Sequence, residues 1–272
     1  MVSRNCSAPY NHTNIRNDDR IFPCCRYKNP IATFNGNVDD ILFTREYNEF
    51  RENLGPGCQK CWDEEDAGEK SLRQEFNEQY DCKEVALRHL EIGFDNICNL
   101  KCDPCWDEWS YQFGEYRTVS PLENIPNTIE KITFLGGEPL MTNRHFLFLK
   151  QIGRTDIEVE YVTNATHRPK DQWVELWNKL DKVSFLVSID GYGNLNEHVR
   201  SPSKWKDVEA NVAFLEERYD ITINTVVHKN NIHGLLPLKI WVGNRKWNVN
   251  KLTYPEEMKC EEGQLSRAMS QL

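Results

Sequence analysis

From about residue 83 onward, short apolar segments alternate with amphipathic ones, and this alternation constrains the fold more than any other feature of the sequence. The apolar segments have the length and the β-branched and aromatic content of strands, whereas the segments between them are typical of helices. Strands are expected over residues 87–94, 131–136, 157–163, 182–190, 221–227 and 249–254. Repeated alternation of this kind favours an α/β fold, with helices packed outside a parallel sheet and right-handed crossovers.

The helical pattern is clearest where Trp173, Leu176, Trp177 and Leu180 follow the i, i+3, i+4, i+7 spacing. Such a stripe predicts a helix face that is buried against the sheet. A closed barrel of eight units takes about 250 residues, and only about 190 residues follow the loop-rich start of this chain. We therefore expect either a partial TIM barrel of about six units, a (β/α)6 core, or an open doubly wound sheet.

The strand expected over residues 182–190 predicts which side chains face a ligand. Its residues alternate between an all-apolar face, suited to the helix layer, and a mixed face that ends in Ser188 and Asp190. Ligands bind at the carboxyl ends of the strands in folds of this type. We therefore expect Ser188 and Asp190 to point into a site inside the barrel.

The first 80 residues have a different character. They are rich in turn signals and show little periodicity beyond a short helix near residues 44–54. A segment with so little apolar patterning usually needs a staple, which its five cysteines could supply. We therefore expect a small loop-rich domain over residues 1–80 and the partial barrel over residues 81–272.

Charge and hydropathy limit the setting in which the protein works. The 272 residues carry a formal net charge of −9, and 39% of them are hydrophobic, which excludes wholesale disorder. No run approaches the roughly 20 apolar residues of a membrane span, and the first residues lack the apolar core of a secretory signal. We expect a cytoplasmic protein without a membrane segment. An acidic chain does not favour nucleic acid as a partner, and the basic and aromatic residues over 239–251 are interpreted as an amphipathic helix and turn.

Nine of the ten cysteines lie in the first 105 residues, and three of them form a tight array. Clustered thiols in a reducing compartment more often hold metal than form disulfides. Cys98, Cys102 and Cys105 are spaced C-x3-C-x2-C directly after the first strand expected for the barrel. Three thiolates on one loop can bind three corners of an iron–sulfur cluster, but they complete neither a four-ligand zinc site nor the four-cysteine set of a ferredoxin. One iron would stay open to bind another ligand.

Further motifs follow the triplet at the ends of later strands. They are Gly136-Gly137-Glu138-Pro139, Thr163-Asn164, Ser188-Ile189-Asp190-Gly191 and, downstream, Arg200. In this order the set resembles the radical S-adenosylmethionine (radical SAM) superfamily. The resemblance implies a partial barrel whose [4Fe–4S] cluster is held by Cys98, Cys102 and Cys105, with S-adenosylmethionine on the fourth iron. Reductive cleavage of S-adenosylmethionine would give methionine and a 5′-deoxyadenosyl radical, which would abstract hydrogen from a substrate.

The resemblance also implies roles for the other motif residues. Gly136 and Gly137 would let the backbone approach the co-substrate, and Glu138 would accept a hydrogen bond from its ammonium group. Ser188 and Arg200 are candidates for its carboxylate, Asp190 for the ribose hydroxyls, and Asn164 for the same ligand. Pro104 stands where family members carry a bulky residue before the third cysteine, so Trp106 is the candidate for contact with the adenine.

Upstream, the segments around Cys6, Cys24, Cys25, Cys58 and Cys61 resemble the SPASM/twitch auxiliary-cluster modules of radical SAM enzymes, placed here before the barrel. With one of the adjacent Cys24 and Cys25, they offer four ligands for a second iron–sulfur cluster or for zinc. Cys82 and Cys260 are interpreted as ordinary thiols, although Cys82 could also ligate or face the substrate.

The resulting hypothesis is a radical SAM enzyme that acts on a peptide, a protein or another peptide-like or small molecule. Its electron donor would be a protein such as flavodoxin or ferredoxin. Two alternatives stay open: radical modification of a nucleotide or tRNA base, and a non-catalytic zinc or iron–sulfur binding protein. Salt-sensitive RNA binding through residues 239–251 would favour the nucleotide alternative.

Overall fold

The structure, a computed structural model, describes residues 5–261 and 263–270. Within these residues, nine strands form one sheet in the order β3-β2-β1-β4-β5-β6-β7-β8-β9. The strands are β1 His12–Ile15, β2 Arg20–Phe22, β3 Ala32–Thr33, β4 His89–Gly93, β5 Lys131–Leu135, β6 Glu158–Thr163, β7 Lys182–Ser188, β8 Asp220–Val227 and β9 Lys246–Lys251. Strands β1 and β4 to β9 run parallel, and β2 and β3 add an antiparallel edge.

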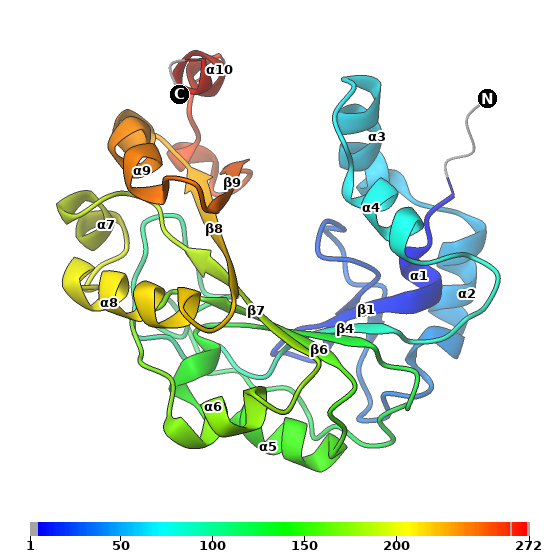
Figure 1. The fold of residues 1–272 in the computed structure, drawn as a ribbon. Coiled ribbons are helices and arrows are strands. Elements are labelled where there is room, and N and C mark those ends of the chain that lie inside the picture. The colour runs from blue at the N-terminus through cyan, green and yellow to red at the C-terminus, as the bar shows by residue number, and fades with distance from the viewer. Residues whose placement is uncertain (1–4, 262, 271–272) are drawn as a thin grey trace.

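The sheet is a partial barrel and not a doubly wound sheet. From β4 to β9 the spatial order of the strands is their order along the chain, so the sheet never reverses direction. It curls into an open horseshoe with helices α5, α6 and α8 on its outer face (Figure 1). All six strands expected from the sequence are present, although β9 begins three residues before the expected start.

Helices and short 3-10 turns connect the strands. The α-helices are α1 Ala8–Asn11, α2 Arg45–Glu52, α3 Gln59–Asp66, α4 Leu72–Gln79, α5 Arg144–Ile152, α6 Asp171–Trp177, α7 Asn194–Val199, α8 Trp205–Glu216, α9 Leu235–Val242 and α10 Gln264–Met269. The 3-10 turns are η1 Ile41–Phe43, η2 Pro56–Cys58, η3 Pro139–Met141, η4 Ile232–Gly234 and η5 Glu256–Met258. Among the described residues, no helix has both the length and the apolar character needed to cross a membrane.

Aromatic side chains fill the space between the sheet and α6. Trp173 and Trp177 are buried, as the helical stripe predicts, and Tyr161 of β6 stacks on Phe185 of β7 with ring centroids 5.5 Å apart. The buried Tyr161 hydroxyl accepts a hydrogen bond from Trp177 Nε1 at 2.9 Å and lies 2.8 Å from His145 Nδ1. These contacts pair the buried Tyr161 hydroxyl and Trp177 Nε1, which avoids the cost of burying them unpaired, whereas Trp173 Nε1 and His145 Nε2 are buried without a partner.

The first 80 residues contribute directly to the sheet. Strand β1 pairs in parallel with β4 in the register His12 to His89 and Asn14 to Glu91. The expectation that the sheet starts near residue 87 is therefore wrong, because β1 is short and polar and its pairing depends on a partner far along the chain. The division into domains at residue 80 stays a prediction.

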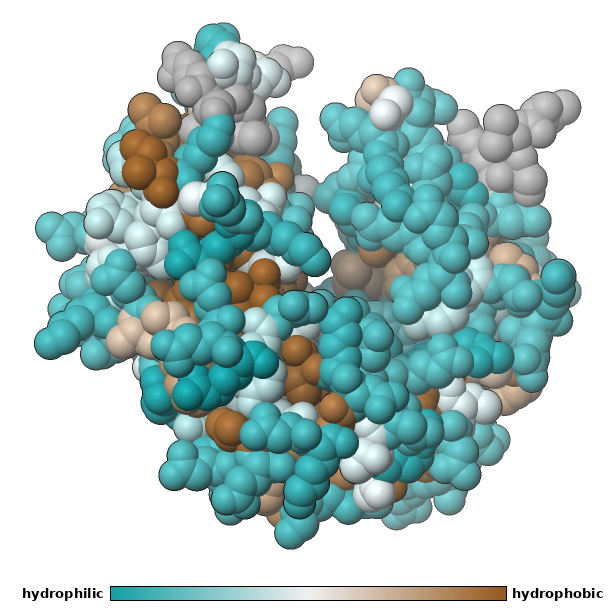
Figure 2. Space-filling model, in the orientation of Figure 1, coloured by the Kyte–Doolittle hydropathy of each residue, from teal (hydrophilic) through white to brown (hydrophobic). Residues whose placement is uncertain are grey.

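Helices α1 to α4 form the second arm of the horseshoe, opposite α9 and α10 (Figure 1). Two of them begin at capping residues. The Thr44 side chain accepts a hydrogen bond from Tyr47 N at the start of α2, and Ser71 and Gln74 form a capping box at the start of α4. Figure 2 shows the notch between the two arms on the surface.

Candidate functional site

A cavity of about 380 Å³ lies inside the horseshoe at the carboxyl ends of the strands. We call it the triplet cavity, because Cys98, Cys102 and Cys105 all line it. Its other lining residues include all but one of the co-substrate residues predicted from the sequence: Gly136, Gly137, Asn164, Ser188, Asp190 and Arg200. Five separate segments of the chain thus meet at one place. The placement of Ser188 and Asp190 confirms that the mixed face of β7 looks into the barrel.

The triplet loop is held in place by backbone hydrogen bonds. Lys101 N donates to Ser201 O at 2.6 Å, and Asp103 N donates to Val199 O at 2.8 Å. The loop therefore pairs with the segment after α7, and this pairing brings Arg200 next to the cysteines. Leu100 N also points at Cys98 Sγ, 3.4 Å away, where it would stabilise a thiolate.

Gly136 and Gly137 fit this site for a reason that the sequence did not show. Gly136 has φ +133°, and a Cβ there would lie 2.6 Å from Asp95 O. A Cβ on Gly137 would lie 2.2 Å from Ile97 O. The glycines thus let the strand-end loop pack against the backbone that leads into the triplet, in addition to lining the cavity.

Glu138 is the predicted ligand residue that does not line the triplet cavity. Its buried carboxylate accepts hydrogen bonds from Thr163 Oγ1 at 2.8 Å, Asn164 N at 2.7 Å and Leu140 N at 3.0 Å. These bonds tie the end of β5 to the end of β6. Burial raises the pKa of Glu138 despite them. In this geometry Glu138 positions Asn164, whose Nδ2 lies 3.9 Å from Cys98 Sγ.

The partly buried Arg200 and the buried Asp190 form an ion pair at the wall of the triplet cavity. Arg200 Nη1 donates to Asp190 Oδ2 at 2.6 Å, and Asp190 Oδ1 accepts from Val226 N at 2.8 Å. Burial alone would lower the pKa of Arg200, but Cys102 and Asp190 outweigh it and raise the pKa, so the guanidinium stays charged. Its buried Nε has no hydrogen-bond partner and is free for an anionic ligand.

The three thiols are protonated in the absence of metal. Burial is the main cause that raises the pKa of Cys98 to about 11 and that of Cys105 to about 12. Metal ligation requires thiolates, so loading this site must release protons. The donor set fits a cluster bound at three corners: three cysteines from one loop beside one buried cation, with space on the open side.

Sequence reasoning missed the side of the cavity that β1 builds. Asn14 of β1 and the next-but-one residue Arg16 line the cavity, together with Cys25 after β2 and Trp109 after the triplet. Arg16 forms an ion pair with Glu108, and its guanidinium lies over the Trp109 ring at 4.7 Å. Polar residues at alternate positions of His12-Thr-Asn-Ile-Arg16 were the available signal, because they share one face of a strand.

A buried polar group continues inward from this side of the cavity. Glu91 Oε2 accepts from Asn14 Nδ2 at 2.6 Å and lies 3.6 Å from His12 Nε2. Burial alone would raise the pKa of Glu91, but His12 is the largest of the opposing causes and they hold it at about 2. Ligand atoms of His12, His89 and Glu91 all lie within 4.8 Å of one another, so this group has the donor types of a metal site.

A second hollow lies between α1, η2, α3 and α4. Four cysteines line it, and we call it the four-cysteine hollow: Cys6, Cys24, Cys58 and Cys61. Burial, followed by neighbouring groups, raises the pKa of Cys6 to about 12 and that of Cys58 to about 11. The adjacent Cys24 and Cys25 are separated, since Cys24 lines this hollow and Cys25 lines the triplet cavity.

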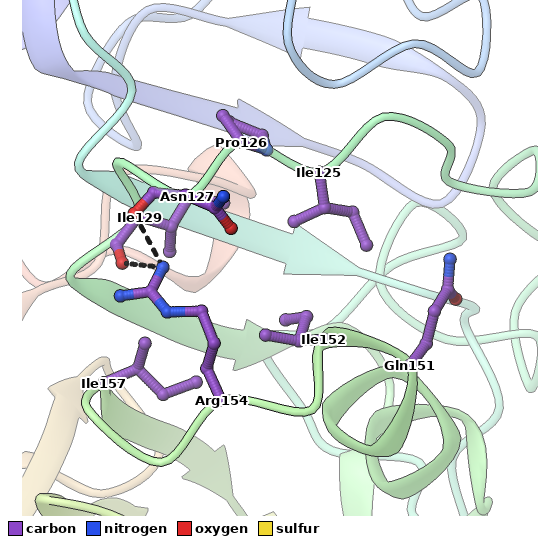
Figure 3. Close-up of a pocket in the computed structure, with 8 residues that line it drawn as sticks. All are labelled: Ile125, Pro126, Asn127, Ile129, Gln151, Ile152, Arg154 and Ile157. Atoms are coloured by element: carbon purple, nitrogen blue, oxygen red, sulfur yellow. Dashed lines mark hydrogen bonds between the residues drawn. The ribbon is translucent and has the colours of Figure 1, made fainter.

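Another pocket, of about 200 Å³, opens at the opposite ends of the strands, next to α5. Figure 3 shows four isoleucines together with Asn127, Gln151 and Arg154 around it, and Arg154 Nη1 donates to the carbonyls of Asn127 and Ile129, at 2.7 and 3.1 Å. The one cation of the pocket is therefore already engaged by backbone. This pocket contains none of the predicted site residues.

Comparisons with known proteins agree with this geometry. The profile of the Radical SAM superfamily matches residues 93–235. A GTP 3′,8-cyclase of Alkaliphilus oremlandii (strain OhILAs) is 24% identical over 132 residues, which are 45% of this chain and 38% of the cyclase. A solved structure of native anSMEcpe with bound AdoMet superposes with a TM-score of 0.55 at 16% identity. That likeness concerns the fold and covers 69% of this chain and 60% of the other.

Proposed function

Because the chain belongs to the radical SAM superfamily, we propose that it cleaves S-adenosylmethionine at a [4Fe–4S] cluster held by Cys98, Cys102 and Cys105. The cleavage would serve to remove hydrogen from a peptide-like substrate. One observation carries the proposal: the triplet and the residues predicted for the co-substrate line a single cavity. When bound, the cluster supplies the electron that opens the sulfonium C–S bond.

The protein's own contribution would be to bind and orient the co-substrate. Arg200 lies beside the triplet loop, and its unpartnered Nε is suited to the co-substrate carboxylate. Ser188 lines the same wall, and Asp190 has the oxygens needed for ribose hydroxyls. Asn164, placed by Glu138, reaches toward Cys98. Trp106 lines the cavity beside the third cysteine and offers an aromatic face to the adenine.

We assign the four-cysteine hollow to an auxiliary iron–sulfur cluster with Cys6, Cys24, Cys58 and Cys61 as ligands. The separation of Cys24 from Cys25 supports the choice of Cys24. Four thiolates saturate a cluster, which suits electron transfer or support for the fold. The same four ligands would satisfy zinc, so metal analysis decides between them.

A nucleotide substrate is the second candidate, favoured by the similarity to a GTP 3′,8-cyclase. The basic stretch near α9 gives it less support than the sequence suggested. Arg245 pairs with Glu216 at 2.9 Å, and Trp241 Nε1 donates to Glu209 at 3.0 Å. These contacts lower the net positive charge that an RNA backbone would need.

The test is anaerobic reconstitution with iron and sulfide, followed by dithionite and S-adenosylmethionine, with 5′-deoxyadenosine measured by chromatography. We expect 5′-deoxyadenosine and about eight irons per chain for two full clusters. Cys98→Ala should abolish the product, whereas Cys260→Ala, which removes a buried thiol outside both sites, should not. A Cys98→Ala protein with the wild-type rate, or a wild type that binds zinc alone, would overturn the proposal.

A further inference from the structure

Cys25 is the cysteine of the triplet cavity that the proposed cluster does not use. It lines the cavity and is solvent-accessible. The strongest electrostatic neighbours of Cys25 are Glu91, Cys24 and Arg26, and not the triplet. Cys25 follows β2, which pairs with β1, so it reaches the cavity from the side that these two strands build.

Two polar side chains on this side, the buried Asn14 and the partly buried Arg16, have buried atoms without a hydrogen-bond partner. Asn14 is 1% exposed and lines the cavity, and its Oδ1 has no hydrogen-bond partner although its Nδ2 donates to Glu91. Arg16 Nε is buried and also without a partner. Buried polar atoms are almost always paired in folded proteins. These atoms therefore point to a ligand that offers a donor to Asn14 and an acceptor to Arg16.

We propose that the substrate occupies this β1 side of the triplet cavity and that the Cys25 thiol gives a hydrogen atom to it. The inference rests on the proposed function, because that reaction first removes a hydrogen atom from a substrate carbon. The S–H bond of Cys25 then breaks homolytically and a new C–H bond forms on the substrate. The sulfur is left as a thiyl radical.

The thiyl radical regains the thiol by taking up one proton and one electron. The electron comes from the one-electron donor that the proposed function already requires. Over the whole cycle the substrate keeps its oxidation level and exchanges one hydrogen for one from solvent. The reaction class is therefore an inversion or exchange at an unactivated C–H position, in a substrate that hydrogen-bonds to Asn14 and Arg16.

The first experiment measures whether the Cys25 thiol is accessible and free of metal in the metal-loaded protein, without turnover. Anaerobic alkylation with iodoacetamide and peptide mapping are compared with and without S-adenosylmethionine. We expect label on Cys25, less label when S-adenosylmethionine is present, and none on Cys24. Iron content should be the same in wild type and in Cys25→Ser. Iron loss in Cys25→Ser, or label on Cys24 with Cys25 protected, would show that Cys25 is a cluster ligand and overturn the proposal.

The second experiment measures hydrogen transfer in D2O, where the thiol carries deuterium. Wild type, Cys25→Ala and Cys260→Ala are incubated with S-adenosylmethionine and dithionite but no substrate. Deuterium is then measured per molecule of 5′-deoxyadenosine. Without substrate, the 5′-deoxyadenosyl radical is left to take the hydrogen atom of the Cys25 thiol within the same cavity. We therefore expect deuterium at the 5′ carbon with wild type and Cys260→Ala and its loss with Cys25→Ala. Equal deuterium in all three would overturn the role of Cys25, whereas wild type that forms no 5′-deoxyadenosine would overturn the proposed function itself.

Discussion

In the triplet cavity the three proposed cluster ligands come from one loop after β4, whereas in the four-cysteine hollow the ligands come from three separate segments of the first 61 residues. The loop presents its thiols from one side and leaves the other side open to Asn14, Arg16 and Cys25. The hollow lies between α1, η2, α3 and α4, and its four thiols come from different segments of its lining. Cysteine side chains thus suit an open reactive site in the triplet cavity and a metal that cross-links distant segments in the four-cysteine hollow. The predictions below test this difference.

The largest effect is expected from Cys98→Ala. It should reduce 5′-deoxyadenosine to background and lower the iron content from about eight to about four per chain. The fold should be retained, because the loop is held by Lys101 N and Asp103 N and not by the metal alone. Product assay, iron analysis and circular dichroism check this. Loss of the whole fold would show that the metal held by the triplet is also required for folding.

Cys58→Ala should act mainly on stability. Removing one ligand of a metal that joins distant segments is expected to cost about 4–5 kcal/mol. The loss should be confined to the arm built by α1 to α4, so limited proteolysis should cut within residues 54–82 before the barrel. Cys82→Ala is the matched control and should leave the pattern unchanged. Cleavage at the same rate in Cys58→Ala and wild type would contradict a stapling role.

Glu138→Gln should be intermediate. The carboxylate accepts from Thr163 Oγ1, Asn164 N and Leu140 N, and an amide offers an N–H in place of one acceptor oxygen. Leaving a buried donor unpaired costs about 1–3 kcal/mol. Urea unfolding measures the stability, and the affinity for S-adenosylmethionine should fall as Asn164 shifts. Unchanged stability would mean that a shift of the backbone satisfies these donors.

The smallest effect, counted per pH unit, is a pH dependence of stability that we assign to His145 of α5. Burial, and next Lys170, lowers the pKa of His145 to about 3. Below pH 6.5 the unfolded chain binds a proton at His145 that the folded chain does not, so stability falls as pH falls. The slope is about 1.4 kcal/mol per pH unit between pH 6.5 and about 3. His145→Gln should flatten this slope in urea unfolding, while an unchanged slope would assign it to other groups.

The barrel could be predicted from sequence where local patterns decide the structure. Strands β4 to β8 have apolar alternation, and Trp173 and Trp177 mark the buried face of α6, so both were found. Strand β1 was missed, because His12-Thr-Asn-Ile is polar and its pairing with β4 depends on residues 77 positions away. Helix α4 was also missed, although its capping box of Ser71 and Gln74 was present in the sequence.

The candidate site divides in the same way. Spacing and strand-end position were enough to nominate Cys98, Cys102, Cys105, Ser188 and Asp190, because a parallel sheet gathers the carboxyl ends of its strands at one edge. The local sequence could not predict which of Cys24 and Cys25 lines which site, since the side chains of adjacent loop residues have no fixed direction. Local sequence patterns also could not show that Glu138 links two strand ends. Thr163 and Asn164 contact Glu138 only because of the register between β5 and β6.

The periodicity of the sequence left a partial barrel and an open doubly wound sheet as alternatives, and the strand order in the structure decided for the barrel. The sequence by itself determined the α/β class and the order of the motifs along the chain. Short-range periodicity and spacing suffice for these, because each strand, helix and loop bears its own pattern. Only the tertiary structure decided which thiol faces which site and that β1 completes the wall of the triplet cavity with Asn14 and Arg16. Those features arise from contacts between segments far apart in the chain, whose energies no local pattern encodes.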